Sequence, residues 1–225
     1  CIRDRDRCDA QTLDIEIFPN RPDLLSGETL TRAIRNFVHR QPAKPSITTT
    51  EGKITLNVEP DLAEIRPVIL GAVVRNVDYT SIGVSADEFI KSLMDHQEKL
   101  HFALGRGRKR ASIGVHDLAK LAPPFAVKAV SGDTEFTPLA ATEPMSIKEI
   151  MAEHPKGIEY AHLLSEFDRY PIILDAENNV LSFPPIINGD HTTVTKETKD
   201  FFIDVTGWDI SCLLYTSPSP RDHQP

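Results

Sequence analysis

The sequence predicts an α+β fold with mixed sheets and packed helices, and three observations support this. First, two capping boxes, Ser85-Ala86-Asp87-Glu88 and Ser146-Ile147-Lys148-Glu149, mark helix starts, since each serine hydroxyl can accept from the amide three residues on. Second, short runs rich in β-branched and aromatic residues, such as 68–77 and 201–205, are typical of strands. Third, no segment repeats at a fixed period, and strands do not alternate regularly with helices.

Residues 1–65 are predicted to form a partial small domain and a linker hairpin. A strand over 13–18 precedes a helix that starts after a turn built by Arg21 and Asp23. A linker over 41–45 leads to a hairpin of 47–50 and 54–58, with its turn at Gly52. Because the chain begins with Cys, we expect a fragment of a longer protein. The helix should bury one face, with i, i+3, i+4, i+7 spacing, made of Leu30, Ala33, Ile34 and Phe37.

Residues 66–209 are predicted to form the main domain. After the strand over 68–77, the helix that begins at Ser85 should end at Gly105. The helix that begins at Ser146 should be terminated by Pro155 and Gly157. Strands over 170–174 and 180–183 flank a polar turn, as in a hairpin. The apolar face of the first helix is expected to consist of Phe89, Leu93, Leu100 and Leu104.

The run from residue 182 to residue 208 contains two features that need explanation. Pro184-Pro185 cannot continue a helix or supply central-strand donors, so the chain must turn there. Asp204 lies inside the apolar strand pattern of 201–205 rather than at its end. A carboxylate in that position needs a partner or a function.

Composition limits the classes of function. The chain has 225 residues, 40% of them hydrophobic, which is enough for a substantial core. A net charge of −8 argues against a protein that coats nucleic acid through overall charge, so any nucleic-acid contact must be local. Three scattered cysteines indicate neither a zinc site nor a disulfide framework. No apolar run is long enough for a membrane span and no signal pattern opens the chain, so we expect a cytoplasmic location and no membrane partner.

Two further features of the chain are its lack of a nucleotide-binding motif and the composition of its last residues. The chain has no phosphate-binding glycine loop, so this fragment should not bind ATP by itself and needs no cofactor or metal. Residues 210–225 are rich in Ser and Pro and break abruptly with what precedes them. We therefore predict a non-native tail that is disordered or loosely attached.

Four motifs in order resemble one family. They are residues 15–25 (IEIFPNRPDLL), 105–108 (GRGR), 111–117 (ASIGVHD) and 182–208 (SFPPIINGDHTTVTKETKDFFIDVTGW). Together, over roughly residues 10 to 209, the chain resembles the β subunit of phenylalanyl-tRNA synthetase of the archaeal and eukaryotic type. The resemblance implies that 66–209 is a B3/B4-type editing domain, which hydrolyses tyrosine wrongly attached to phenylalanine tRNA. It also implies a parent α2β2 enzyme that uses ATP and Mg²⁺, with the α subunit and phenylalanine tRNA as partners.

The resemblance also implies an editing pocket that contains Ile173, Ser182 and Asp204. Ile173 would supply pocket wall, while Ser182 and Asp204 would recognise the tyrosine hydroxyl. Each residue also has a simpler structural interpretation. Ile173 can be a core residue, Ser182 an ordinary strand-end hydroxyl, and Asp204 a cap for a turn at Thr206-Gly207.

Hydrolysis needs an activated water, and the sequence shows no Ser-His-Asp set or metal cluster to supply it. His116, His162 and His191 fall in or near the matched motifs, and His191 is the best candidate base because it lies in the loop between apolar segments. The alternative is that the terminal ribose of the tRNA and backbone groups position the water.

One dense basic run, Arg106, Arg108, Lys109 and Arg110, follows the predicted helix end. It is interpreted either as a tRNA phosphate contact or as a solvated loop. Two further functions stay open. The module can be a non-catalytic unit that docks tRNA or the α subunit, or a free-standing protein that binds amino acids or aminoacyl-tRNA.

Overall fold

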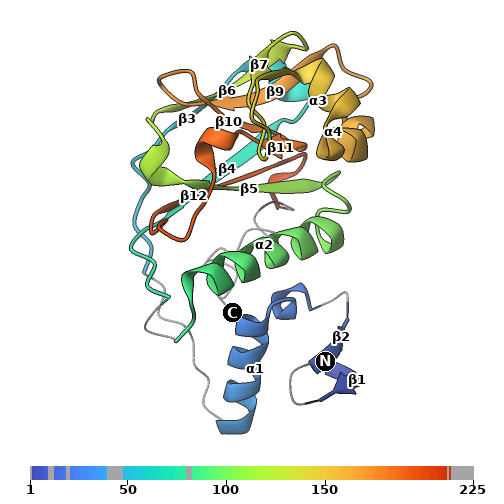
Figure 1. Ribbon diagram of the computed structural model, residues 1–225, viewed down its shortest axis with the longest axis vertical. Helices are drawn as coiled ribbons and strands as arrows, with labels where there is room; N and C mark the ends of the chain where they lie inside the picture. Colours follow the sequence, from blue (N-terminus) through green and yellow to red (C-terminus); the bar gives the residue numbers. More distant parts are fainter. Residues whose placement is uncertain are drawn as a thin grey trace.

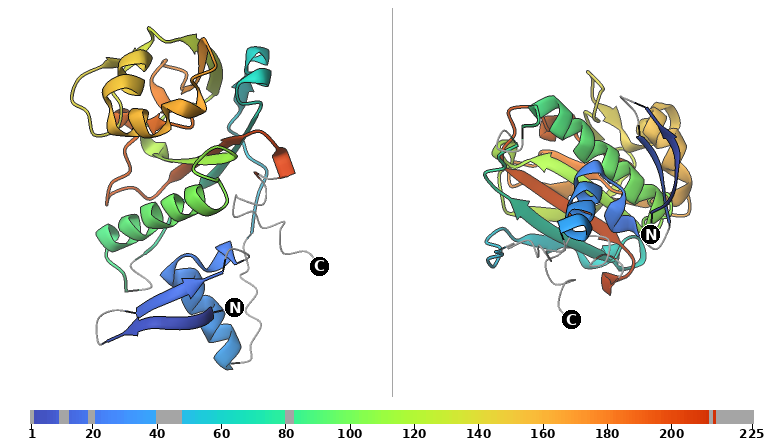
Figure 2. Two further views of the ribbon diagram at one scale, coloured as in Figure 1. Left: turned by 90° about the vertical axis from the view of Figure 1, so that its right-hand side faces the viewer. Right: turned by 90° about the horizontal axis from the view of Figure 1, so that it is seen from below.

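The computed structural model describes residues 2–9, 13–18, 21–39, 48–79, 83–211 and 213. It confirms the α+β class. A hairpin and helix α1 (Gly27–His39) lie at one end, and α2 (Ala86–Ala103) runs between them and a three-stranded sheet (Figures 1 and 2). A five-stranded sheet with helices α3 (Ile147–Glu153) and α4 (Pro155–Tyr160) forms the other end.

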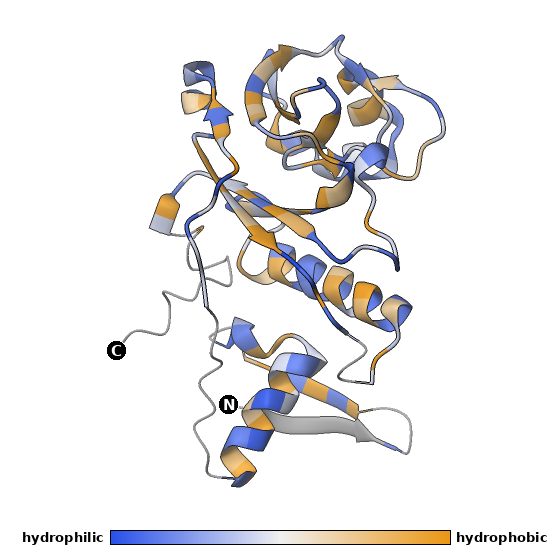
Figure 3. Cartoon of the chain, turned by 90° about the vertical axis from the view of Figure 1, so that its left-hand side faces the viewer, coloured by the Kyte–Doolittle hydropathy of each residue, from blue (hydrophilic) through white to orange (hydrophobic). Residues whose placement is uncertain are grey.

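The front segment contains the predicted strand and helix. Strands β1 (Ile2–Cys8) and β2 (Leu13–Ile17) pair antiparallel and are followed by η1 (Pro22–Leu24). Arg21 donates to both carboxylate oxygens of Asp23 at 2.9 and 2.7 Å, which confirms the turn interpretation. The predicted buried face of α1 is wrong, because Phe37 is 86% exposed and no residue of α1 is buried. Leu30 and Ala33 of that face are half-buried, whereas Ile34 is exposed like Phe37. Figure 3 shows apolar and polar residues side by side along α1.

The predicted linker hairpin does not form. Residues 48–55 have no regular structure, and 41–45 and Ile47 lie outside the described residues. Strand β3 (Leu56–Val58) instead pairs in parallel with β6 (Phe125–Ser131). Ile54 and Leu56 thereby pack against the main core, a larger apolar burial than a local hairpin could provide. The next element, η2 (Pro60–Glu64), buries Leu62 in the same core.

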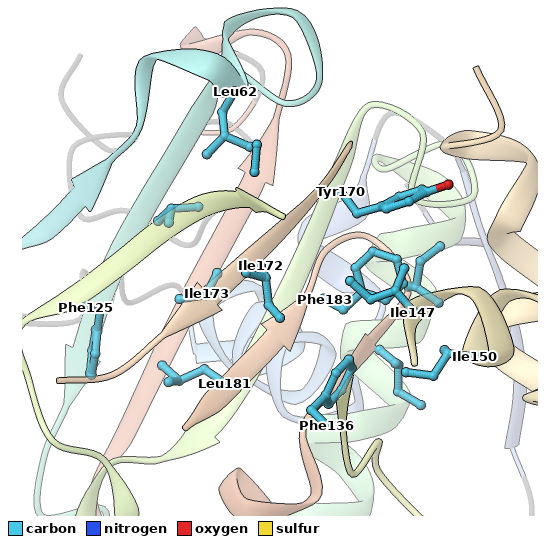
Figure 4. Packing of buried hydrophobic residues seen from close by; sticks show 14 of the residues in the cluster. Leu62, Phe125, Phe136, Ile147, Ile150, Tyr170, Ile172, Ile173, Leu181 and Phe183 are labelled. Atoms are coloured by element: carbon cyan, nitrogen blue, oxygen red, sulfur yellow. The ribbon is translucent and has the colours of Figure 1, made fainter. Parts of the chain in front are cut away.

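The five-stranded sheet has the order β11 (Ile187–Asn188), β10 (Val180–Phe183), β9 (Arg169–Leu174), β6 and β3. The predicted β9/β10 hairpin is confirmed. The buried Asp175 carboxylate holds its turn by accepting from the amides of Glu177 and Asn179 at 2.9 and 2.8 Å. Large side chains of the sheet, α3 and the short pair β7 (Glu135–Phe136) and β8 (Met145–Ser146) form the main hydrophobic core, as Figure 4 shows.

Helices α3 and α4 differ from the prediction at their junction. The Ser146 capping box is confirmed, and Pro155 does end α3, but it also begins α4. Gly157 does not terminate a helix but lies inside α4. The position requires glycine, because a Cβ there would lie 1.7 Å from the Ile150 carbonyl oxygen. The glycine therefore permits a close approach between the two helices.

The three-stranded sheet has β12 (Phe201–Gly207) between β4 (Val68–Val74) and β5 (Ala111–Asp117), antiparallel to both. Phe202 of β12 lies in the main core, while Val205 lies in a smaller core on the opposite face. On that face the Phe89 ring of α2 contacts Phe201, with 6.2 Å between centroids. The Ser85 capping box that opens α2 is confirmed.

The predicted exclusion of 210–225 from the fold is wrong at one residue. Leu213 is fully buried and packs with Ala111 and Val205, because Gly207 leaves room for its side chain. Cys212 and 214–225 lie outside the described residues.

The remaining short elements are η4 (Leu118–Lys120), η5 (Ala161–Leu163) and η6 (Asp190–Thr192). Within the described ranges, none of the helices combines the length and apolar content that a bilayer crossing requires.

Candidate functional site

A pocket of about 480 Å³ lies along β5, the edge strand of the three-stranded sheet. One wall is a face of α2 that includes Ile90 and Met94. The opposite wall is the segment that follows β10, which includes Pro184-Pro185 and most of 186–194. The pocket is thus built where two sheets and α2 meet, and its walls are largely apolar.

Asp204 contributes a buried carboxylate to this pocket. It is 1% exposed, and its Oδ2 lies 2.7 Å from Nε2 of His116, which is fully buried. Asp204 lies opposite Gly114 in the sheet register. A Cβ at position 114 would stand 1.9 Å from Oδ2, so the glycine provides the space that the carboxylate occupies. Asp204 is therefore not a cap for the turn at Thr206-Gly207.

The other nitrogen of His116 continues the hydrogen-bond network. Nδ1 lies 2.8 Å from Oγ1 of Thr192, which in turn lies 3.1 Å from the carbonyl oxygen of Gly189. Thr192 is 1% exposed and lines the pocket. The network therefore joins β12, β5 and the loop around η6 in one buried chain of contacts.

A buried cation balances the carboxylate. Arg66 donates to Oγ1 and the carbonyl oxygen of Thr206 at 2.6 and 2.8 Å and to Oγ of Ser112 at 3.1 Å. Burial lowers the pKa of Arg66 to about 9, while the negative charge of Asp204 opposes that shift. The guanidinium therefore stays charged at neutral pH, and the ionised form of Asp204 has a compensating charge in the same interior.

One oxygen of Asp204 is available to a ligand. Among the residues that the structure describes, the hydrogen bond of the carboxylate is the one between Oδ2 and His116, and none involves Oδ1. An ionised carboxylate oxygen is an acceptor only, so the group it can take is a donor such as a hydroxyl or an amine.

The structure brings two of the three predicted pocket residues together. Ser182, which is 4% exposed, lines the same pocket as Asp204, and its hydroxyl donates to Oδ1 of Asn188 at 3.2 Å. Ile173 does not line it. Ile173 pairs with Ser182 but lies on β9, one strand further inside, where it is fully buried in the main core. Its role as pocket wall is therefore corrected to that of a core residue.

The three candidate histidines lie in different environments. His191, the preferred candidate, is exposed, does not line the pocket, and has its Nε2 2.7 Å from the carbonyl oxygen of Lys120. His162 contacts the carbonyl oxygen of Glu159 through Nδ1 at 3.1 Å and is also away from the pocket. Only His116 joins the carboxylate network. Two other histidines line the pocket: His101 has contacts at both ring nitrogens, and Nδ1 of His154 accepts from the amide of Lys156 at 3.2 Å.

The predicted basic run separates into two groups. Arg106, Lys109 and Arg110 are exposed, whereas Arg108 is only 7% exposed. The guanidinium of Arg108 donates to the carbonyl oxygen of Ile186 at 2.8 Å and to Glu98 at 2.6 Å. The prediction of Arg108 as a phosphate contact is therefore corrected, because its side chain turns inward and ties the pocket wall to α2.

The contacts around Glu98 fix this corner of the pocket. A hydrogen bond from His101 lowers the pKa of Glu98 to about 2, with Arg108 adding to the effect and burial opposing it. His101 is 3% exposed and accepts from the amide of Ile113 at 2.8 Å through Nε2. Burial lowers the pKa of His101, although Glu98 raises it. The Arg108 guanidinium also lies over the Tyr160 ring, 4.4 Å from its centroid.

The sequence did not predict that His116 pairs with Asp204. It also did not predict that Gly114, Thr192 and Arg66 contribute to the site. Gly114 carries the one local signal, since a glycine inside a strand pattern indicates a close approach. In the part of the chain that the structure describes, no group of three or more His, Cys, Asp or Glu side chains could hold a metal ion.

Comparisons with known proteins agree with this architecture. Residues 67–218 match the B3/4 domain, which defines the chain as a member of the B3/4 domain class. The beta subunit of phenylalanine–tRNA ligase from Methanosarcina acetivorans is 50% identical over 204 residues, which cover 91% of this chain and 36% of that protein. The Archaeoglobus fulgidus beta subunit is 45% identical over 206 residues, covering 92% and 37%. The chain belongs to the phenylalanine–tRNA ligase beta-subunit family.

A solved structure supports the same conclusion. An N-terminal fragment of the phenylalanyl-tRNA synthetase beta subunit from Pyrococcus horikoshii has a TM-score of 0.81 and 36% identity to this chain. The alignment covers 91% of this chain and 57% of that fragment. The chain spans about a third of the length of the curated relatives that it matches.

Proposed function

We propose that this chain edits errors of its parent enzyme by hydrolysing the ester of tyrosine with phenylalanine tRNA. The observation that carries the proposal is the buried carboxylate of Asp204, which lines a largely apolar pocket and whose described hydrogen bond uses Oδ2 alone. Such a pocket admits an aromatic ring and offers one acceptor to a phenolic hydroxyl.

The physical need for a second site follows from the chemistry of the two amino acids. A synthetic pocket built for the phenylalanine ring cannot strongly reject tyrosine, since a comparable added hydroxyl gives discrimination of only about 10²-fold. A pocket that hydrogen-bonds the hydroxyl works in the opposite sense. Bound phenylalanine would leave the Asp204 oxygen without a donor, so binding of phenylalanyl-tRNA to the editing pocket is disfavoured. The correctly charged tRNA therefore escapes hydrolysis.

Ser182 contributes to the same recognition indirectly. Its hydroxyl holds the side chain of Asn188, and both residues line the pocket near the proline turn. Ile173 supports this wall from the core behind it. We assign recognition to Asp204, assisted by Ser182, and no direct substrate contact to Ile173.

Hydrolysis requires water at the ester, which lies at the far end of a bound tyrosine from its hydroxyl. None of the histidines His116, His162 and His191 lines the pocket, so we propose that the terminal ribose of the tRNA and backbone groups position this water. His191 remains a second candidate because its loop is adjacent to pocket residues 192–194.

The tRNA and partner assignments rest on the family and on surface charge. Arg106, Lys109 and Arg110 project from the end of α2, next to the pocket corner held by Arg108, and are proposed to contact tRNA phosphates. We propose that the parent protein pairs with an α subunit as an α2β2 ligase in the cytoplasm. Its ATP and Mg²⁺ would serve the ligation of phenylalanine in other parts of that enzyme.

The test uses the complete enzyme that contains this chain, loaded with tyrosine on phenylalanine tRNA. Deacylation is measured for the wild type, Asp204→Ala and Ser182→Ala. We expect Asp204→Ala to reduce the rate by at least tenfold and Ser182→Ala to reduce it less. Undiminished deacylation in Asp204→Ala would remove the basis of the proposed recognition.

The second candidate is a non-catalytic module that binds tRNA or aminoacyl-tRNA. The observation in its favour is that none of the histidines in the matched motifs, His116, His162 and His191, lines the pocket. It predicts that the wild-type enzyme binds tyrosyl-tRNA through this domain yet deacylates it no faster than the spontaneous rate.

A further inference from the structure

Asp204 can accept from a phenolic hydroxyl only if its carboxylate is held with Oδ1 toward the pocket. An aspartate side chain can rotate about two bonds, and rotation would exchange or withdraw the two oxygens. The position of Oδ2 therefore decides what Oδ1 offers to a ligand. In this structure the group that holds Oδ2 is the imidazole of His116, at 2.7 Å.

His116 is itself held from its other side. Its ring is fully buried, stacks near Phe202 with 5.9 Å between centroids, and meets Thr192 through Nδ1 at 2.8 Å. Thr192 is fixed in turn to the Gly189 carbonyl oxygen. The ring thus has partners at both nitrogens and no freedom to turn without losing one of them.

The backbone is arranged around this pair. Gly114 faces both Asp204 and His116, and a Cβ there would lie 1.9 Å from Oδ2 and 2.7 Å from Nε2. The contact therefore depends on a glycine in the interior of a strand, a residue that weakens strands elsewhere.

We infer that His116 is a positioning residue, which orients the Asp204 carboxylate so that Oδ1 reads the hydroxyl of the bound amino acid. The inference rests on the proposed function. His116 contacts no substrate, since Asp204, Gly114 and Thr192 line the pocket and His116 lies behind them. It acts on the selectivity of the site and not on the chemical step.

A matched pair of substitutions separates the two nitrogens. The amide nitrogen of glutamine occupies about the place of Nε2 of histidine, whereas that of asparagine occupies about the place of Nδ1. His116→Gln thus keeps a donor for Asp204 and loses the Thr192 contact, and His116→Asn does the reverse. Deacylation of tyrosyl-tRNA and phenylalanyl-tRNA by the complete enzyme is measured for both variants and for Asp204→Ala.

The expected result is a loss of at least tenfold in kcat/KM for tyrosyl-tRNA in His116→Asn, close to the loss in Asp204→Ala. His116→Gln should stay within about threefold of the wild type, and the slow deacylation of phenylalanyl-tRNA should change in neither. Equal losses in both variants, or no loss in either, would overturn the positioning role. If Asp204→Ala itself has no effect, the proposed function fails instead.

Thermal unfolding shows whether both His116 variants fold, since each loses one of the ring's two hydrogen bonds. If one does not, Thr192→Val and Thr192→Ser provide the same test from the other end. Valine fills the volume of threonine without its hydroxyl, and serine keeps the hydroxyl. Because both variants keep the contact of His116 with Asp204, we expect each, like His116→Gln, to deacylate tyrosyl-tRNA within about threefold of the wild type; a loss of tenfold or more in the valine variant would contradict the inference.

Discussion

Gly114→Ala should damage the site through one methyl group. The new Cβ would stand 1.9 Å from Oδ2 and 2.9 Å from Cγ of Asp204, where ordinary contacts begin near 3.4 Å. The carboxylate oxygen must therefore move by about 1.5 Å, which breaks its contact with His116. We expect overpacking to lower the free energy of unfolding by about 1–3 kcal/mol. A misplacement of about 1 Å caused by a change far from the reacting bond can reduce rates by about 10²-fold, so tyrosyl-tRNA deacylation should fall by a similar factor.

Two assays and one control measure this. Urea unfolding of purified protein gives the change in stability, and single-turnover deacylation gives the change in rate. Gly52→Ala is the control, because a Cβ there meets nothing within 4 Å. A Gly114→Ala protein with the stability and rate of Gly52→Ala would show that the carboxylate does not occupy the space beside Gly114, and the geometry of the site would be refuted.

Three further predictions concern residues whose environments differ from their sequence pattern. Arg108→Ala should lower the free energy of unfolding by about 1–3 kcal/mol, because it leaves buried carbonyl oxygens unpaired. Lys109→Ala should change the free energy of unfolding by less than about 0.5 kcal/mol. Chemical denaturation compares the two variants, and equal effects would contradict the burial of Arg108. Ile173→Val should cost about 0.5–1.5 kcal/mol and leave deacylation unchanged, so a rate effect without a stability effect would return it to the pocket wall. The free energy of unfolding should fall as the pH drops from 6.5 past the lowered pKa of His101, because the unfolded chain binds a proton there that the buried ring does not. A pH series of melting curves should show a shallower fall for His101→Gln than for the wild type.

The sequence predicted features whose causes are local. Both capping boxes join residues three apart, and the β9/β10 hairpin joins strands across five turn residues, so their patterns are complete within short windows. Asp204 was singled out for a similar reason, as an acid within an apolar strand pattern. Its partner could not be read in the same way, because His116 lies 88 positions earlier in the chain.

The predictions that were wrong concern features that depend on residues far away in the chain. Nothing near Arg108 distinguishes it from Arg106, and only the carbonyl groups of Pro185 and Ile186 draw it inward. The hairpin predicted around Gly52 gave way to a parallel pairing with β6, because the main core buries more apolar surface than a local turn. The face of α1 that includes Phe37 follows the helical period, but Ile34 and Phe37 on it are exposed. Periodicity predicts which side is apolar, not what covers it.

The central position of β12 has a consequence for synthesis. β12 is the last strand of its sheet in chain order, yet it lies between β4 and β5, which do not pair with each other. On the ribosome, those two strands therefore have no partner in this sheet until residues 201–207 have emerged. Asp204 arrives with the same strand, so the candidate pocket is complete only when the sheet closes. A nascent chain stopped before Phe201 contains His116, Gly114 and Ser182 but no carboxylate for them to surround.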